Sequence, residues 1–286
     1  METGNALYQD QMDRFIRGED VPEASLRRVW QNTTQPFTTF DSPISEELFR
    51  AVRAVNMSLP PDRRLRVLLG DPPVDWDRVT PQDLGEWQTG MAQRDSYPAG
   101  LVRREVLAKH RRALMIYGGM HFQRKNLDFN YQAEDQRSRS IVNLLEDSPP
   151  STTLFTIWTN TAGDLQTLQP DVNAWPRPSL AMIRGTVLGA ADFTFYYRFE
   201  SDRFVSRGGI LEPIPRDQWR TFRMEDQVDA IMYVGSPSEI TYRSLSPALC
   251  ADADYLKMRL ARFALVGLPP AAADRVKQFC AGVAPR

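Results

Sequence analysis

Short apolar runs that end in glycine are the feature that most restricts the fold of this chain. Two such runs, Leu65–Gly70 and Ala113–Gly118, are separated by residues with the spacing of amphipathic helices. A third run, Ala230–Gly235, lies far along the chain, and Leu154–Trp158 has a similar apolar character. Runs of this length, bounded by turn residues, are typical of buried strands. Helices between such strands indicate crossover connections and therefore parallel pairing.

The first 60 residues predict helices. Apolar side chains recur at helical spacing up to Gly18, which is placed to end the first helix. Pro22 and the pair Ser42–Pro43 are placed to open two more helices, because proline fits the first helical turn. Thr80–Asp83 has the form of a capping box and predicts a further helix. Two amphipathic helices are expected to close the chain.

These patterns predict one α/β domain over residues 1–286, with a mostly parallel, mixed sheet flanked by helices. Its parts are an N-terminal helical segment (1–60), a core strand–helix–strand unit (61–150) and a loop-rich second half with closing helices (151–286). Aromatic residues gather between Trp175 and Phe199. They indicate ordered loops, which either line a lid or pocket or pack into a core.

Composition excludes several classes of protein. Hydrophobic residues make up 42% of the chain and charged residues 25%, with a formal net charge of −1. These values exclude a disordered chain and a nucleic-acid binder that acts through overall positive charge. We interpret the basic stretch Arg103–Lys125 as a solvated helix face and expect no nucleic-acid partner. No apolar run approaches the roughly 18 residues of a transmembrane segment. The expected partner is a small-molecule substrate or ligand.

The chain holds two cysteines, Cys250 and Cys280, and two histidines. So few cysteines give no disulfide framework, and we expect reduced thiols and a cytoplasmic location. The first residues do not form a signal peptide, although a start placed too late would hide an export signal. Two histidines also exclude a zinc site that needs several Cys or His ligands. The motifs of serine hydrolases, Walker NTPases, Rossmann dehydrogenases and zincins are missing.

Polar residues follow the glycines at the ends of three runs. Asp71 follows the first run, His121 the second and Ser236 the third. In a parallel sheet these ends share one edge, and ligands bind outside the carboxyl ends of the strands. Asp71 and His121 are therefore candidate site residues, and the imidazole of His121 suits a base or a ligand. The alternative is that the glycines serve turns only and Asp71 caps a loop.

Several longer strings resemble a known family. They are Phe49–Asn56 (FRAVRAVN), Leu65–Trp76 (LRVLLGDPPVDW), Arg94–Asp95, Ala113–Arg124 (ALMIYGGMHFQR), Arg184–Thr186 and Asp229–Ser236 (DAIMYVGS). Together they look like the superfamily of erythromycin esterases and ChaN-like haem-binding uptake (Tiki) proteins. They are most similar to a bacterial branch that shares the Gly-Asp-Pro-Pro-x-Asp-Trp segment. The resemblance covers most of the chain.

The resemblance implies a hydrolase-like protein in which His121 assists the attack of water on an ester or amide. In that mechanism Glu2 orients the base, and Arg94 or Arg124 stabilises the oxyanion. The residues that we expect in the site, in catalytic, oxyanion-stabilising or substrate-binding roles, are His121, Arg94, Asp95, Asp71, Glu2, Arg124 and Tyr117.

The chain also departs from the family pattern. The family opens with a strand that ends in a Gly-Glu-x-x-His-type motif, and this motif is missing here. Either the start is placed too late, or the chain is a fragment or a degenerate, inactive member. The alternative function is haem or metal binding without catalysis, with His121 and Tyr117 near the group. A divalent metal and haem both remain open as cofactors, and a third interpretation is a fold without a site.

Overall fold

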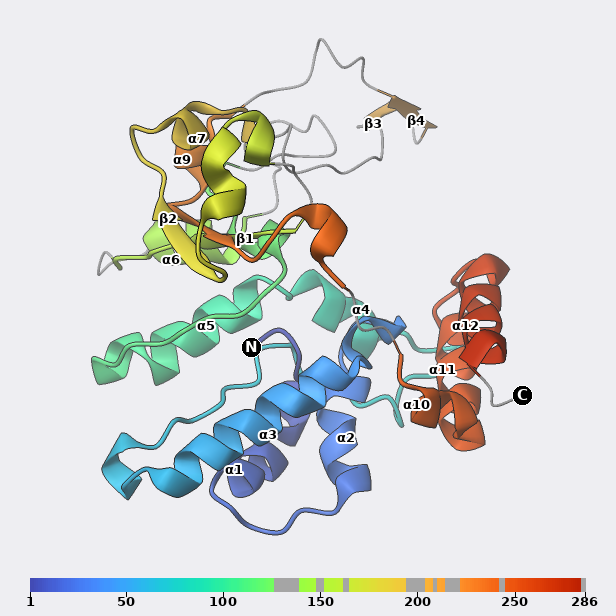
Figure 1. Cartoon of the computed structure of the whole chain (residues 1–286). Helices are drawn as coiled ribbons and strands as arrows, with labels where there is room; N and C mark the ends of the chain where they lie inside the picture. The colour runs from blue at the N-terminus through green and yellow to red at the C-terminus, as the bar shows by residue number, and fades with distance from the viewer. Residues whose placement is uncertain are drawn as a thin grey trace. The chain divides into compact units, whose positions relative to one another are not determined.

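The computed structural model describes residues 1–125, 139–147, 152–161, 165–193, 204–207, 210–213, 222–241 and 245–283. The chain forms two compact units, of which the first comprises residues 1–117 and 242–286 and the second residues 118–241. Figure 1 shows the elements of both units. The sequence predicts one domain over residues 1–286, whose three parts meet near residues 60 and 150. In the structure the chain passes from the first unit to the second after Tyr117 and returns at residue 242.

Helices dominate the N-terminal part of the first unit. After the short 3₁₀ turn η1 (Ala6–Tyr8) come α1 (Gln9–Ile16), α2 (Glu23–Gln31) and α3 (Pro43–Ser58). As predicted, Gly18 follows α1 with a φ of 99°, and Pro22 directly precedes α2. The side chain of Ser42 caps α3. Helix α1 packs against α2 and α3 (Figure 1). Their buried side chains form a shared core that includes Met12, Phe15, Leu26, Trp30 and Phe49.

The remaining helices of the first unit come from two parts of the chain. They are α4 (Gly85–Ala92), α5 (Ser96–Glu105), α10 (Pro247–Ala251), α11 (Ala253–Leu265) and α12 (Pro270–Val283), with the 3₁₀ turns η2 (Thr38–Phe40), η3 (Pro61–Arg63) and η4 (Leu107–Lys109). Helices α11 and α12 are the two closing helices that the sequence predicts. Among the described residues, no helix combines the length and apolar character needed to cross a bilayer.

Helix α4 begins later than the capping-box pattern predicts. Thr80 and Asp83 close a turn by exchanging two backbone hydrogen bonds of 3.0 Å. The helix starts at Gly85, whose N–H donates to the carboxylate of Asp83. The Thr80 hydroxyl also accepts from the Asp83 N–H at 3.1 Å, so the pattern marks this turn, and the helix begins two residues after it.

Two runs that were predicted as strands are extended in the first unit without forming regular strands. Met1–Asn5 runs between Leu65–Gly70 and Ala113–Tyr117: the Met1 amine donates to the Leu68 carbonyl, and the Glu2 N–H to the Ile116 carbonyl. Asn5 and Asp71 form a single parallel bridge. This one bridge is parallel, and the mostly parallel sheet that the sequence predicts is not confirmed by it. A continuous ladder does not form over these few bonds.

The second unit contains a three-stranded sheet in the order β1–β5–β2. Strand β1 (Ile157–Asn160) runs parallel to β5 (Ala230–Tyr233), whereas β2 (Ser179–Met182) runs antiparallel to it. The chain therefore combines α and β structure as predicted, with a small mixed sheet. The other elements are η5 (Gly119–Phe122), α6 (Ile141–Glu146), η7 (Leu165–Thr167), η8 (Pro170–Ala174), α7 (Val187–Ala190), the antiparallel pair β3 (Phe204–Arg207) and β4 (Ile210–Pro213), α9 (Met224–Gln227) and η10 (Pro237–Glu239).

The aromatic-rich stretch contributes to the core of the second unit. The ring of Trp175 meets the ring of Tyr233 edge-on, with centroids 6.0 Å apart. Phe193 packs beside Trp158 at 5.8 Å. Core packing thus accounts for Trp175 and Phe193, while residues 194–199 lie outside the described part of the chain.

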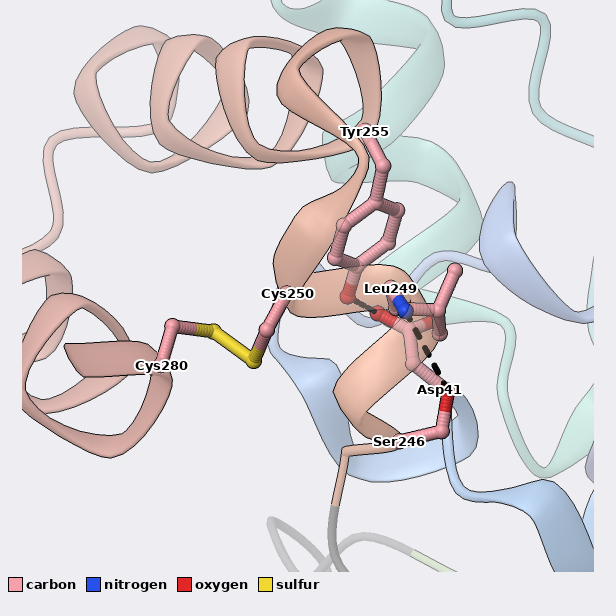
Figure 2. The surroundings of a disulfide bond; sticks show 6 residues. All are labelled: Asp41, Ser246, Leu249, Cys250, Tyr255 and Cys280. Carbon is pink, nitrogen blue, oxygen red and sulfur yellow. Dashed lines mark hydrogen bonds between the residues drawn. A yellow bond between two sulfur atoms is a disulfide. The ribbon is translucent and has the colours of Figure 1, made fainter. Parts of the chain in front are cut away.

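Cys250 of α10 and Cys280 of α12 form a disulfide (Figure 2). The expectation of reduced thiols was therefore wrong. Helices α10 and α12 pack together and share a core, which brings two residues 30 positions apart into bonding distance. Disulfides are typical of oxidising compartments, so the premise for a cytoplasmic location no longer holds.

A buried ion pair attaches α11 to the N-terminal part of the first unit. Arg259 lies 2.7 Å from the carboxylate of Asp41. The Tyr255 hydroxyl donates to the same carboxylate, as Figure 2 shows. Arg259 and Asp41 are 1% and 2% exposed. Burial raises the pKa of Asp41, and the charge of Arg259 opposes this rise. Nη1 and Nη2 of Arg259 also donate to the carbonyls of Pro36 and Gln31, whereas its Nε is buried without a hydrogen-bond partner among the described residues.

Replacing Asp41 by asparagine should lower the stability of the first unit strongly. The substitution leaves the buried Arg259 cation uncompensated, which costs about 3–5 kcal/mol. Urea unfolding followed by tryptophan fluorescence measures the loss. The exposed ion pair Arg28–Asp77 supplies the control, since Asp77→Asn should change stability little. Equal effects of the two substitutions would contradict a structural role for the buried pair.

The disulfide should stabilise the C-terminal helices. Closing a loop of 30 residues is worth about 3–4 kcal/mol in the chain-entropy model. The double substitution Cys250→Ser/Cys280→Ser should lower the unfolding free energy by this amount. Thiol titration of the unreduced, denatured protein should find no free thiol, and two after reduction. Two reactive thiols before reduction would show that the bond does not form.

Candidate functional site

Asp71 is the most deeply buried of the predicted site residues. It follows Leu69 and Gly70, and Leu69 is fully buried in the core of the N-terminal helices. The carboxylate of Asp71 accepts two hydrogen bonds of 2.6 Å, from the backbone N–H and the hydroxyl of Thr34. Its side chain is 0% exposed. Asp71 is thus held inside the first unit, next to the loop that follows α2.

Arg94 lies between two carboxylates. It occupies the connection between α4 and α5, and its guanidinium donates to Glu2. The Nε of Arg94 lies 3.9 Å from Asp71 Oδ1. The side chains of Arg94 and Glu2 remain 16% and 13% exposed, so this part of the cluster reaches the surface. Asp95 stands at the N-cap position of α5.

Tyr117 completes the cluster. A Cβ added to Gly70 would lie 1.7 Å from the Tyr117 hydroxyl oxygen, so the absence of a side chain at Gly70 makes room for this hydroxyl. Burial raises the pKa of Tyr117, and the charges of Glu2 and Asp71 raise it further. The hydroxyl therefore stays protonated at physiological pH. We call Glu2, Asp71, Arg94 and Tyr117 the acid–arginine cluster.

Burial makes the carboxyl of Asp71 a weaker acid than an exposed aspartate. Desolvation raises the pKa of its carboxyl to about 7, although the hydrogen bonds from Thr34 and the charge of Arg94 both lower it. The negative charge of Glu2 adds to the rise. A carboxyl with a pKa near neutrality can hold a proton or release it at physiological pH, as general acid–base chemistry requires.

Two predicted site residues belong to the second unit. His121 lies in the 3₁₀ turn η5 and is half-buried, and its N–H donates to the Gly118 carbonyl. Arg124 pairs with Asp229 at 2.7 Å and with Glu146 at 3.2 Å, so its guanidinium is engaged by carboxylates. The acid–arginine cluster and Asp95 lie in the first unit. The predicted site residues are therefore divided between the two units, with the acid–arginine cluster and Asp95 in the first and His121 and Arg124 in the second.

Sequence reasoning missed two residues around Asp71. Thr34 supplies both donors to its carboxylate, yet it lies in a loop after α2 without a motif that would mark it. Tyr97 in α5 is half-buried, and the charge of Asp71 helps to raise the pKa of its phenol, after the larger effect of burial. Only its position three residues after Arg94 hinted at a place near the site.

The described residues offer no metal centre. No group of three or more His, Cys, Asp or Glu side chains that could hold a metal ion occurs in the part of the chain that the structure describes. Glu2 and Asp71 face Arg94, whose positive charge opposes that of a cation.

Comparisons with known proteins returned no similar family or fold. No protein-family model, no curated protein and no solved structure matches the chain.

The stability of the protein should fall between about pH 4 and pH 7 because of Asp71. Its pKa is raised in the folded state from 3.8 to about 7, so the folded state binds the proton more tightly than the unfolded state. The stabilisation is complete below pH 4 and is lost as the pH rises through 7. It amounts to roughly 4 kcal/mol at most. Urea unfolding at several pH values should show that the free energy of unfolding depends less on pH in Asp71→Asn than in wild type. The exposed Asp77→Asn should keep the wild-type slope, and an unchanged slope in Asp71→Asn would refute this assignment.

Proposed function

We propose that the chain is a hydrolase-like protein that uses the acid–arginine cluster in the attack of water on an ester or amide. One observation carries the proposal: a buried carboxyl with a pKa near 7, Asp71, lies beside the partly exposed pair of Glu2 and Arg94. Perturbed titratable groups next to an accessible cation are typical of catalytic sites. The resemblance to erythromycin esterases and ChaN-like proteins points to the same reaction class.

In this proposal Arg94 stabilises the charge that develops on the carbonyl oxygen. Its guanidinium has donors in a planar fork and retains exposed surface, so a substrate carbonyl can approach it. Glu2 and Asp71 hold the guanidinium from two sides. A donor that stabilises the oxyanion is worth about 10²–10³ in rate. Arg94 therefore carries the largest expected effect within the cluster.

Proton transfer has more than one candidate group in this proposal. Asp71 can exchange a proton near neutral pH, and the Tyr117 hydroxyl is a donor that stays protonated. The resemblance assigns the base that activates water to His121, a residue of the second unit, and the proposal for the acid–arginine cluster of the first unit does not depend on that assignment. Within the cluster, a positioned base contributes about 10²–10⁴ in rate. The proposal includes the mostly parallel sheet of the family, and the parallel bridge between Asn5 and Asp71 is the observation that supports it.

Hydrolysis of a panel of aryl esters, lactones and amides between pH 5 and 9 tests the function. Arg94→Met should lower kcat/KM about 100-fold or more, the effect of losing one oxyanion donor. Arg104→Met is the matched control, because Arg104 is an exposed arginine of the neighbouring helix α5. Its rate should stay within about twofold of wild type. No hydrolysis by the wild type, or equal rates in Arg94→Met and Arg104→Met, would contradict the proposal.

Haem or metal binding is the alternative function, and the described residues hold no group of three or more His, Cys, Asp or Glu side chains for a metal ion. Haem titration gives a direct comparison of the two functions. A Soret band that appears with wild type and is lost in His121→Ala would replace the hydrolase proposal by the binding one.

A further inference from the structure

The four residues Gln31–Thr34 connect the C-terminal helices with the candidate site. Arg259 and Arg262, one turn apart on α11, both donate to the Gln31 carbonyl, at 3.0 and 2.9 Å. Arg262 also donates to the Asn32 side-chain oxygen at 2.8 Å. The two arginines are 1% and 8% exposed. One end of the segment is thus fixed by buried cations of α11.

Indole and amide donors fix the rest of the segment. The indole N–H of Trp76 donates to the carbonyls of Asn32 and Thr33, and that of Trp87 donates to the Thr34 carbonyl at 2.8 Å. Asn5 donates to the Asn32 carbonyl at 2.6 Å. Each backbone carbonyl of Gln31–Thr34 therefore accepts a hydrogen bond from a side chain that is distant in sequence.

Arg262 and Trp76 stack on each other, and both donate hydrogen bonds to this segment. The guanidinium of Arg262 lies over the Trp76 ring, 4.7 Å from its centroid. Arg262 holds Gln31 and Asn32, and Trp76 holds Asn32 and Thr33. A displacement of Arg262 would therefore disturb the hydrogen bonds to the backbone carbonyls of Gln31, Asn32 and Thr33, the three residues before Thr34.

We propose that Thr34 is the positioning residue of Asp71, and that Arg262 keeps Thr34 in place through the segment Gln31–Thr34. The role of these contacts in hydrolysis rests on the proposed function, whereas the positioning of Asp71 by Thr34 does not depend on it. Thr34 is 0% exposed and aims its N–H and its hydroxyl at the two oxygens of one carboxylate. Both bonds are made to the charged form of Asp71, so they favour that form.

Other charged and titratable groups also face Asp71. They are Arg94 and Glu2 from the acid–arginine cluster and the phenols of Tyr97 and Tyr117. A substitution at Thr34 or Arg262 leaves these four side chains in the protein. The contribution of Thr34 can therefore be separated from theirs.

The experiment follows the Asp71 carboxyl by NMR of protein labelled with ¹³C in aspartate, with Asp71→Asn to assign the signal. Thr34→Val removes the hydroxyl donor and should raise the titration midpoint by about one pH unit. Thr34→Ser keeps the hydroxyl and should restore the wild-type midpoint to within about 0.3 units. A midpoint that stays unchanged in Thr34→Val overturns the role of Thr34.

Hydrogen exchange tests the role of Arg262. In Arg262→Met the Thr34 amide should exchange at least tenfold faster than in wild type, and the Asp71 midpoint should move in the same direction as in Thr34→Val. Lys257→Met is the control, because Lys257 is an exposed residue of the same helix. Arg262→Lys keeps the charge without the planar fork and serves if Arg262→Met does not fold. Exchange as slow as in Lys257→Met overturns the role of Arg262.

Activity measurements on the same variants separate the two proposals. If the wild type hydrolyses no substrate but the Asp71 midpoint moves in Thr34→Val, the proposed function fails and the positioning role stands. If the wild type hydrolyses esters but the midpoint does not move, the positioning role fails and the function stands. If the proposed function and the positioning role are both correct, the pH optimum of kcat should be higher in Thr34→Val than in wild type, and Thr34→Ser should have the wild-type optimum.

Discussion

The buried ion pair between Arg259 and Asp41 joins the beginning and the end of the first unit. Two charges that are this deeply buried are costly to desolvate, and the pair is tolerable only because each charge is matched by its partner and by further hydrogen bonds. The pair fixes the position of α11 relative to residues 31–41. Arg262, one turn further along α11, therefore reaches Gln31 and Asn32.

The acid–arginine cluster depends on the same packing. The loop after α2 brings Thr34 to Asp71, and the extended N-terminal residues bring Glu2 to Arg94. Elements far apart in sequence thus enclose one carboxyl and keep water from it. Exclusion of water raises the pKa of Asp71, whereas Thr34 and Arg94 lower it. The acidity of this group is a property of the packed unit, since an exposed aspartate would titrate near 3.9.

Local signals predicted the helices of the N-terminal part well. Gly18, Pro22 and Ser42 each act within one turn of their own helix, by left-handed backbone, fixed φ or side-chain capping. The strands were predicted less well. The run Leu65–Gly70 is extended as expected, but a strand also needs a partner along its length, and its neighbour Met1–Asn5 bonds to it at only a few positions. Among the site residues, Asp71, Arg94, Glu2 and Tyr117 could be named from the sequence, and the structure brings these four together. That His121 and Arg124 belong to the second unit could not be foreseen, because the boundary at residue 117 carries no break in composition.

The sequence by itself determined where α1 ends, where α2 and α3 begin, and which polar residues follow the apolar runs. Those features depend on neighbours within a few positions of the chain. Only the tertiary structure decided the disulfide between α10 and α12, the partner of Asp41 and the two donors that Thr34 directs at Asp71. Each of these depends on packing that brings distant residues together and removes them from water. Burial and long-range pairing are properties of the folded unit, so no local pattern encodes them.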